Sequence, residues 1–137
     1  MAHYHLVPDA SLHLRDPSAS AIGERILSAG LRLMTEIGLE TLTFKKLAEQ
    51  AECTEATIYK YFPNKQRLLQ YYFQLYWMWL DTHCQQEGRS LPDAWERVQG
   101  DIRSLCGLWA KDAMAAQLDP ALLRALVIVE GSKSFLH

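Results

Sequence analysis

The sequence predicts an all-α protein on the strength of three features. Apolar residues recur every three to four positions over most of the chain. Serine, threonine, asparagine or aspartate precedes these runs, where its side chain can accept from free helix amides. The chain has 137 residues, of which 49% are hydrophobic and 22% charged, so it can bury a core. We expect a three-helix helix-turn-helix domain followed by a partial second helical domain.

The N-terminal segment to about Asp16 shows no periodicity and contains Pro8. These features predict a flexible arm over residues 1–17, as is usual for chain termini. His3 and His5 could bind a metal in principle, but a frayed terminus is the simpler interpretation.

Either Ser18 or Ser20 can cap the first helix, which we expect to end at Gly38, a residue suited to a left-handed helix end. Gly30 lies inside this helix. It either allows close packing there or is a poor helix former that the protein tolerates. The apolar positions of the helix are Ile22, Ile26, Ala29, Leu33 and Ile37.

Two short helices joined by a tight turn follow. Thr43 can cap the first, whose inward positions are Phe44, Leu47, Ala48 and Ala51. Thr54 can cap the second, and Ile58 and Phe62 close a small core beneath it. Pro63 stops this helix because proline lacks the amide that the next turn needs. The side chains left for solvent or a ligand are Glu55, Ala56, Thr57, Tyr59, Lys60 and Tyr61. Such a helix-turn-helix makes double-stranded DNA the first partner to consider.

The next helix follows Asn64, a candidate cap, and is apolar or aromatic on almost every face as far as Leu80. A helix of this kind cannot be solvated all round, so it joins a second helical layer or lies in an interface. Lys65, in its first turn, gains nothing from the positive end of the helix dipole. It therefore either meets a phosphate at that helix end or is a solvated lysine on a turn.

Two further helices are predicted after a break at residues 88–92. Asp93 can begin one that runs through Trp109, and Asp119 with Pro120 can begin another that runs through Val129.

Residues 22 to about 80 resemble the DNA-binding domain of the TetR (tetracycline-repressor-like) family of bacterial transcriptional regulators. The resemblance rests on residues 42–48, 54–65 and 68–69, and its most specific part is 57–65. It implies that the helix starting near Thr54 is a recognition helix that enters the major groove. The DNA-binding residues that it implies are Lys45, Thr54, Glu55, Ala56, Thr57, Tyr59, Lys60, Tyr61 and Lys65. In these roles lysines neutralise phosphates, tyrosine hydroxyls bond phosphate oxygens, and small side chains approach base edges.

The chain then divides into the arm (1–17), a helix-turn-helix DNA-binding domain (18–66) and a helical regulatory domain (67–137). TetR-like proteins normally continue with helices that complete an effector pocket and a dimer interface. We expect these helices to be missing here, either because the sequence is a fragment or because it is a naturally shortened member. The resemblance implies a repressor that binds a palindromic operator, as a homodimer if the C-terminal helices are present. It also implies that a small apolar or aromatic effector releases the repressor from DNA. Candidate effector-binding residues are Tyr72, Tyr76, Trp77 and Trp109, with Trp79, Trp95 and Met114 as further positions. Plain core packing is the alternative for each of them.

Two positions depart from the family pattern. Glu52 stands in the turn where glycine is usual, so either a non-glycine residue adopts a left-handed backbone or the turn differs. Glu55 stands where lysine, glutamine or serine is commoner. Its carboxylate either accepts from a cytosine amino group or is a favourable charge in the first turn of its own helix.

The formal net charge is −2, which is unusual for a DNA-binding protein until it is divided along the chain. Residues 41–69 carry five cations and three anions, whereas residues 81–137 carry six cations and eight anions. This small asymmetry has the direction expected for a DNA-binding N-terminal half. The arm contains a single cation, Arg15, so we do not expect it to grip DNA.

Other classes of function find little support in the sequence. The three cysteines show no CxxC spacing, so reduced thiols are expected rather than disulfides or a zinc site. No apolar stretch approaches the ~20 residues that span a bilayer, and no leader segment is evident, so a cytoplasmic location is expected. No metal site, cofactor or catalytic motif is predicted. His83 and Cys84 come nearest to a catalytic dyad, but they are adjacent on a helix and point about 100° apart. The alternative function is a helical protein-interaction module, in which residues 68–80 mediate association without productive DNA binding.

Overall fold

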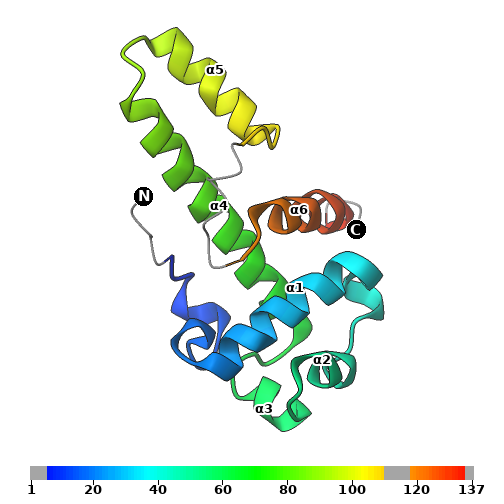
Figure 1. The fold of residues 1–137 in the computed structure, drawn as a ribbon. Helices are drawn as coiled ribbons and strands as arrows, with labels where there is room; N and C mark the ends of the chain where they lie inside the picture. The colour runs from blue at the N-terminus through cyan, green and yellow to red at the C-terminus, as the bar shows by residue number, and fades with distance from the viewer. Residues whose placement is uncertain (1–5, 110–117, 135–137) are drawn as a thin grey trace.

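The structure, a computed structural model, describes residues 6–109 and 118–134, and its elements there are helices (Figure 1). The all-α prediction is confirmed. In chain order the elements are the 3-10 turns η1 (Ala10–Leu12) and η2 (Pro17–Ala19), followed by α1 (Ala21–Thr41), α2 (Phe44–Ala51), α3 (Glu55–Tyr59), α4 (Lys65–Arg89), α5 (Ala94–Leu105) and α6 (Pro120–Ser134).

Side-chain caps start the first five α-helices, as predicted. In each case a side-chain oxygen accepts a hydrogen bond from a backbone amide of the first turn, which would otherwise have no partner. The capping residues of α1 to α5 are Ser20, Thr43, Thr54, Asn64 and Asp93. The choice between Ser18 and Ser20 is thereby settled in favour of Ser20.

Helix α4 is the central element. Helices α1, α2 and α3 gather around its N-terminal half, α5 folds back along its C-terminal half, and α6 lies against α1 and α4 (Figure 1). Fully buried side chains from these elements form the core: Ile26, Leu31, Met34, Leu42, Leu47, Ile58, Phe62, Leu68, Tyr71, Tyr72, Leu123 and Leu126.

Close packing explains the glycine inside α1. The Tyr72 hydroxyl donates a hydrogen bond of 2.6 Å to the carbonyl of Leu27. A Cβ atom on Gly30 would lie 2.5 Å from that hydroxyl oxygen, which is well inside van der Waals contact. Glycine at position 30 therefore lets α4 approach α1.

Several helix ends differ from the predicted ones. Gly38 has φ 78° and ψ 163°, so it interrupts α1 as expected, but one helical turn continues to Thr41. Helix α4 runs to Arg89, well past Leu80, whereas α5 ends at Leu105, before Trp109.

Residues 6–17, the described part of the predicted flexible arm (1–17), are packed against the helices. Leu12 is 7% exposed. The Asp9 amide donates to Gln74 Oε1 on α4 at 2.6 Å, and the Leu14 amide donates to the Tyr61 carbonyl at 2.7 Å. Burial of an apolar side chain and satisfied backbone amides hold residues 6–19 against α4 and the end of α3, which periodicity alone could not indicate. His3 and His5 lie outside the described residues.

Helix α6 is joined to the interruption in α1. Its Glu130 side chain is 4% exposed, and Oε1 accepts from the Leu39 amide and from Lys133 Nζ, both at 3.2 Å. The buried carboxylate thus satisfies a backbone donor that the break at Gly38 leaves outside the regular helix.

Candidate nucleic-acid interface

The turn between α2 and α3 contains a left-handed residue. Glu52 has φ 54° and ψ 50°, so the first of the two alternatives for this position holds. The turn closes in the way of a helix C-cap, since the Cys53 amide donates to the Ala48 carbonyl at 3.0 Å. The helix-turn-helix therefore forms without glycine at the position where glycine is usual.

Helix α3 combines a buried side with an exposed one. Ile58 is fully buried beneath it, while Glu55, Ala56, Tyr59 and Lys60 are exposed and Thr57 is half-buried. The Thr54 hydroxyl accepts from the Thr57 amide at 3.2 Å and lies 2.9 Å from the Thr57 hydroxyl. The two hydroxyls thereby fix the first turn of the helix, and six of the predicted DNA-binding residues lie at or next to the exposed side.

Tyr59 has the strongest support from packing as a surface contact. Its side chain is 50% exposed, and its ring meets the buried ring of Phe44 edge to face, with the centroids 4.9 Å apart. Such an edge-to-face pair holds one side of the ring, so less rotamer freedom is lost when the phenol binds a partner. Lys45, on α2, is also exposed.

Tyr61 does not lie on the exposed side where it was predicted. It is 2% exposed, and its hydroxyl lies 2.8 Å from Ser20 Oγ. The physical reason is that α3 ends at Tyr59 and the chain tightens: the amides of Lys60 and Tyr61 donate to carbonyls three residues earlier. A 3-10 turn advances by about 120° per residue instead of 100°, which brings the next side chain inward.

Lys65 makes contacts within the chain that neither of the two predicted roles included. Its Nζ donates to the carbonyls of Glu40 and Leu42 at 3.1 and 3.0 Å. Lys46 Nζ donates similarly to the Thr41 carbonyl at 3.1 Å. Both ammonium groups thus cap the carbonyl end of α1, where a positive charge is favourable.

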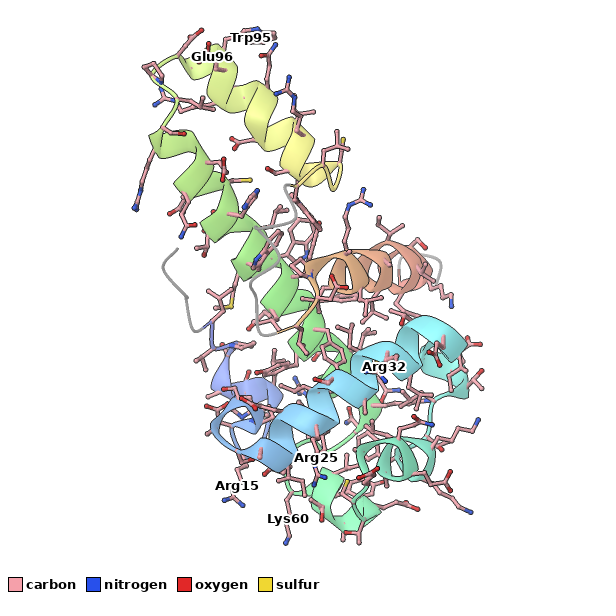
Figure 2. All side chains as sticks on the ribbon, in the orientation of Figure 1. Arg15, Arg25, Arg32, Lys60, Trp95 and Glu96 are labelled. Atoms are coloured by element: carbon pink, nitrogen blue, oxygen red, sulfur yellow. The ribbon has the colours of Figure 1, made fainter. Side chains whose placement is uncertain are left out.

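Two arginines that are not among the predicted DNA-binding residues lie near α3, and one of them, Arg15, is the single cation of the arm that we did not expect to grip DNA. The Arg15 guanidinium carbon is 5.8 Å from the Tyr61 ring centroid. Arg25 is exposed on α1. Burial raises the pKa of the Cys53 thiol, and the positive charge of Arg25 opposes this rise. Arg25 therefore lies near Cys53, in the turn between α2 and α3. Figure 2 shows Arg15, Arg25 and Lys60 at the same end of the molecule. Their sequence signal is weak because tertiary packing alone brings them together.

The predicted effector residues differ in their exposure. Tyr72 is fully buried and bonded to α1, Tyr76 is buried, and Trp77 is 51% exposed. Trp109 packs edge to face on Trp79, with the centroids 4.7 Å apart, and its Nε1 donates to the Ser104 carbonyl.

A hollow of about 180 Å³ lies elsewhere, between α1, α4 and the start of the C-terminal segment. Its lining residues are Ser18, Glu24, Leu27, Ser28, Leu75 and Leu118. Among the further effector positions, Trp95 is 65% exposed, and Met114 lies outside the described residues.

Within the described ranges, no group of three or more His, Cys, Asp or Glu side chains is placed to hold a metal ion. His83 stacks on Trp79 at 5.1 Å between ring centroids. No helix among the residues searched is both long and apolar enough to cross a membrane.

Comparison with known proteins bears on the same segment. Residues 26–72 match the family described as "Bacterial regulatory proteins, tetR family". Three curated relatives also match. An uncharacterized HTH-type transcriptional regulator of Bacillus subtilis, YvkB, is 34% identical over 79 residues, which are 58% of this chain and 36% of the relative. Tetracycline repressor protein class G of Vibrio anguillarum is 41% identical over 44 residues, 32% of this chain and 21% of the relative.

The third relative, an uncharacterized HTH-type transcriptional regulator of Haemophilus influenzae, is 47% identical over 49 residues, 36% of this chain and 26% of the relative. The chain thus spans only about a third or less of the length of these relatives. No solved structure matches significantly. The caps of α2, α3 and α4, the turn and the exposed side of α3 lie within residues 26–72, and this segment is the part of the chain that is similar to bacterial regulators of the TetR family.

Proposed function

We propose that this protein is a transcriptional regulator that binds double-stranded DNA with α3 in the major groove. The observation that carries the proposal is the exposed side of a buried, capped helix, with Tyr59 and Lys60 facing solvent. Ala56 and Thr57 are small enough for the helix backbone to approach base edges, where a methyl group can meet a thymine methyl. Lys45 and Lys60 supply the charge that releases counterions from phosphates.

We further propose that the regulator is a cytoplasmic repressor. Two copies bind a palindromic operator, because recognition helices fit successive major grooves when they are about 34 to 36 Å apart. A small apolar or aromatic effector that prefers a wider separation would release the DNA. A tetracycline repressor among the relatives and the aromatic residues around Trp79 and Trp109 support this form. The relatives' printed names describe regulators, so we propose a regulatory rather than a catalytic role.

Salt-dependent binding tests the central claim. The double variant Lys45→Ala/Lys60→Ala should reduce the slope of log Kobs against log salt by about 2, because each phosphate contact contributes about 0.9. The probe is a duplex of about 30 base pairs selected from a random pool by the wild-type chain, long enough for two half-sites. Arg89→Ala/Arg103→Ala removes the same charge from exposed sites on α4 and α5 and should leave the slope unchanged. Equal slopes for wild type and Lys45→Ala/Lys60→Ala would reject α3 as the DNA-binding element.

The second candidate is a helical protein-interaction module. Residues 68–80 were its predicted surface, but Tyr71, Tyr72, Tyr76 and Trp79 are buried there. The exposed apolar residues of α5 favour it instead, since Trp95, Val98, Ile102 and Leu105 are each at least 46% exposed. Size-exclusion chromatography beside the gel-shift titration separates the two functions. Oligomers that give no salt-sensitive shift indicate the module.

A further inference from the structure

The segment before α1 is held next to the end of the recognition helix. The Leu14 amide donates to the Tyr61 carbonyl at 2.7 Å, Leu12 is buried, and Asp16 caps η2 by accepting from the Ser18 amide at 2.9 Å. Residues on both sides of position 15 are thus fixed by bonds and burial. Arg15 itself is exposed, so the fold determines where its side chain leaves the surface.

The Arg15 side chain lies over the ring of Tyr61, with 5.8 Å between the guanidinium carbon and the ring centroid. At this distance a guanidinium is attracted by the electrons of the ring face. The ring therefore holds the charge close to Tyr61, while the exposed side chain of Arg15 remains accessible to a partner. The described residues give Arg15 no ion-pair partner within 4.0 Å, so no carboxylate there neutralises its charge.

Arg15 and Lys60 flank the same backbone hydrogen bond, because one follows Leu14 and the other precedes Tyr61. Consecutive Cα atoms are 3.8 Å apart, so the Cα atoms of Arg15 and Lys60 lie within about 14 Å of each other. Both side chains extend from the end of the molecule that carries α3, opposite Trp95 and Glu96 (Figure 2). A DNA backbone that passes Lys60 is therefore within reach of a second cation.

We propose that Arg15 is a DNA-phosphate contact, delivered by the folded N-terminal segment and oriented by the Tyr61 ring. This inference rests on the proposed function and extends the interface beyond the helix-turn-helix. It also gives buried Tyr61 a role: the ring positions a neighbouring cation instead of touching DNA. A guanidinium suits that position because it can stack on a ring and donate two N–H groups to phosphate oxygens.

The test measures binding of the selected duplex by wild type, Arg15→Ala, Arg15→Lys and Arg89→Ala as salt rises from about 50 to 200 mM. One lost phosphate contact lowers the slope of log Kobs against log salt by about 0.9. Between these two salt concentrations, the fold-loss of affinity of Arg15→Ala should therefore be roughly three to four times smaller than that of wild type. Arg15→Lys keeps the charge and should keep the slope, and Arg89→Ala should match wild type. Thermal unfolding should show that Arg15→Ala is folded at the assay temperature, because Arg15 is exposed and the variant removes only one surface cation–π contact.

Phosphate-ethylation interference on the same duplex supplies a second measurement. Wild type should show an interfering phosphate beside those protected by α3, and that position should lose its effect in Arg15→Ala. If Lys45→Ala/Lys60→Ala lowers the slope while Arg15→Ala has the wild-type slope and pattern, the Arg15 contact is wrong and the proposed function stands. If wild type shows no salt-sensitive binding, both proposals fail.

Discussion

At the scale of single residues, Glu52 sets the geometry of the turn before α3. A left-handed backbone costs a non-glycine residue roughly 1 kcal/mol, and Glu52 has φ 54°. We expect Glu52→Gly to raise the free energy of unfolding by up to about 1 kcal/mol, as measured by urea denaturation. Glu49→Gly, at an exposed position inside α2, should lower it by about 1 kcal/mol. A loss of stability in Glu52→Gly would show that the glutamate side chain stabilises this turn.

Tyr71 makes stability depend on alkaline pH. Burial raises the pKa of its hydroxyl to about 12, from the ordinary value of 10.0. A pKa raised by folding gives stability that is complete below pH 10 and is lost as the pH rises to 12. That loss amounts to about 2 kcal/mol.

The variant Tyr71→Phe tests this dependence. It should be close to wild type in stability at pH 7, because the hydroxyl is buried, has no well-formed hydrogen bond within the described ranges, and has only Ser18 beside it as a hydrogen-bonding side chain. Urea denaturation between pH 10 and 12 should show a shallower loss in the variant. Burial also raises the pKa of Tyr72, so some alkaline loss should remain. Identical profiles for wild type and variant would mean that Tyr71 titrates normally.

The direction in which a side chain of α3 points could be predicted from the sequence only where the chain keeps regular α-helical geometry. The outward positions Tyr59 and Lys60 follow from the pattern of Ile58 and the cap at Thr54, both local features. Tyr61 does not, because its direction depends on the tighter turn after Tyr59. The role of Lys65 depends on carbonyls about 25 residues earlier in the chain, which no spacing rule reports.

At the scale of elements, the packing of α4 on α1 depends on one pair of residues. Alanine at position 30 would gain roughly 1 kcal/mol of helix propensity, but its Cβ would lie 2.5 Å from the Tyr72 hydroxyl oxygen. We expect Gly30→Ala to lower the free energy of unfolding by about 1 to 3 kcal/mol, because overpacking displaces the ring and breaks its bond to Leu27.

A double-mutant cycle checks this cause. Tyr72→Phe removes the oxygen that clashes, so Gly30→Ala should cost clearly less in the Tyr72→Phe background than in wild type. Chemical denaturation of the four proteins gives the coupling free energy. Additive effects would place the strain elsewhere, for example at Leu68, whose Cδ2 would lie 3.3 Å from the new Cβ.

The elements themselves were largely predictable, because caps and apolar periodicity are local. Helices α1 to α4 begin at the expected residues, and Gly38 interrupts α1 as its conformational freedom suggests. The N-terminal segment was not predictable, since 3-10 turns of three residues are too short for periodicity. Its fixed position depends on a hydrogen bond between residues 14 and 61, and the candidate contact at Arg15 follows from that.

At the scale of the whole molecule, α5 carries a row of exposed apolar residues on the side that faces away from α4. Ser104 is buried and Arg97 lies against Gly88 of α4, so small and polar residues form the contact with α4. The opposite side carries Trp95, Val98, Ile102 and Leu105, which recur every three to four residues and are 65%, 46%, 54% and 50% exposed. A continuous apolar strip of this kind is typical of surfaces that associate.

We therefore expect the protein to self-associate through α5 at micromolar concentration, and Ile102→Lys to shift it toward the monomer. A charge at the centre of the strip would have to be desolvated on association, which costs several kcal/mol when it is left unpaired. Sedimentation equilibrium over a concentration series measures the shift. Glu96→Gln is the matched control, since it changes the net charge by the same amount at an exposed residue outside the strip. If wild type is monomeric throughout the series, or Ile102→Lys associates as wild type does, the strip is not an interface between copies of this chain.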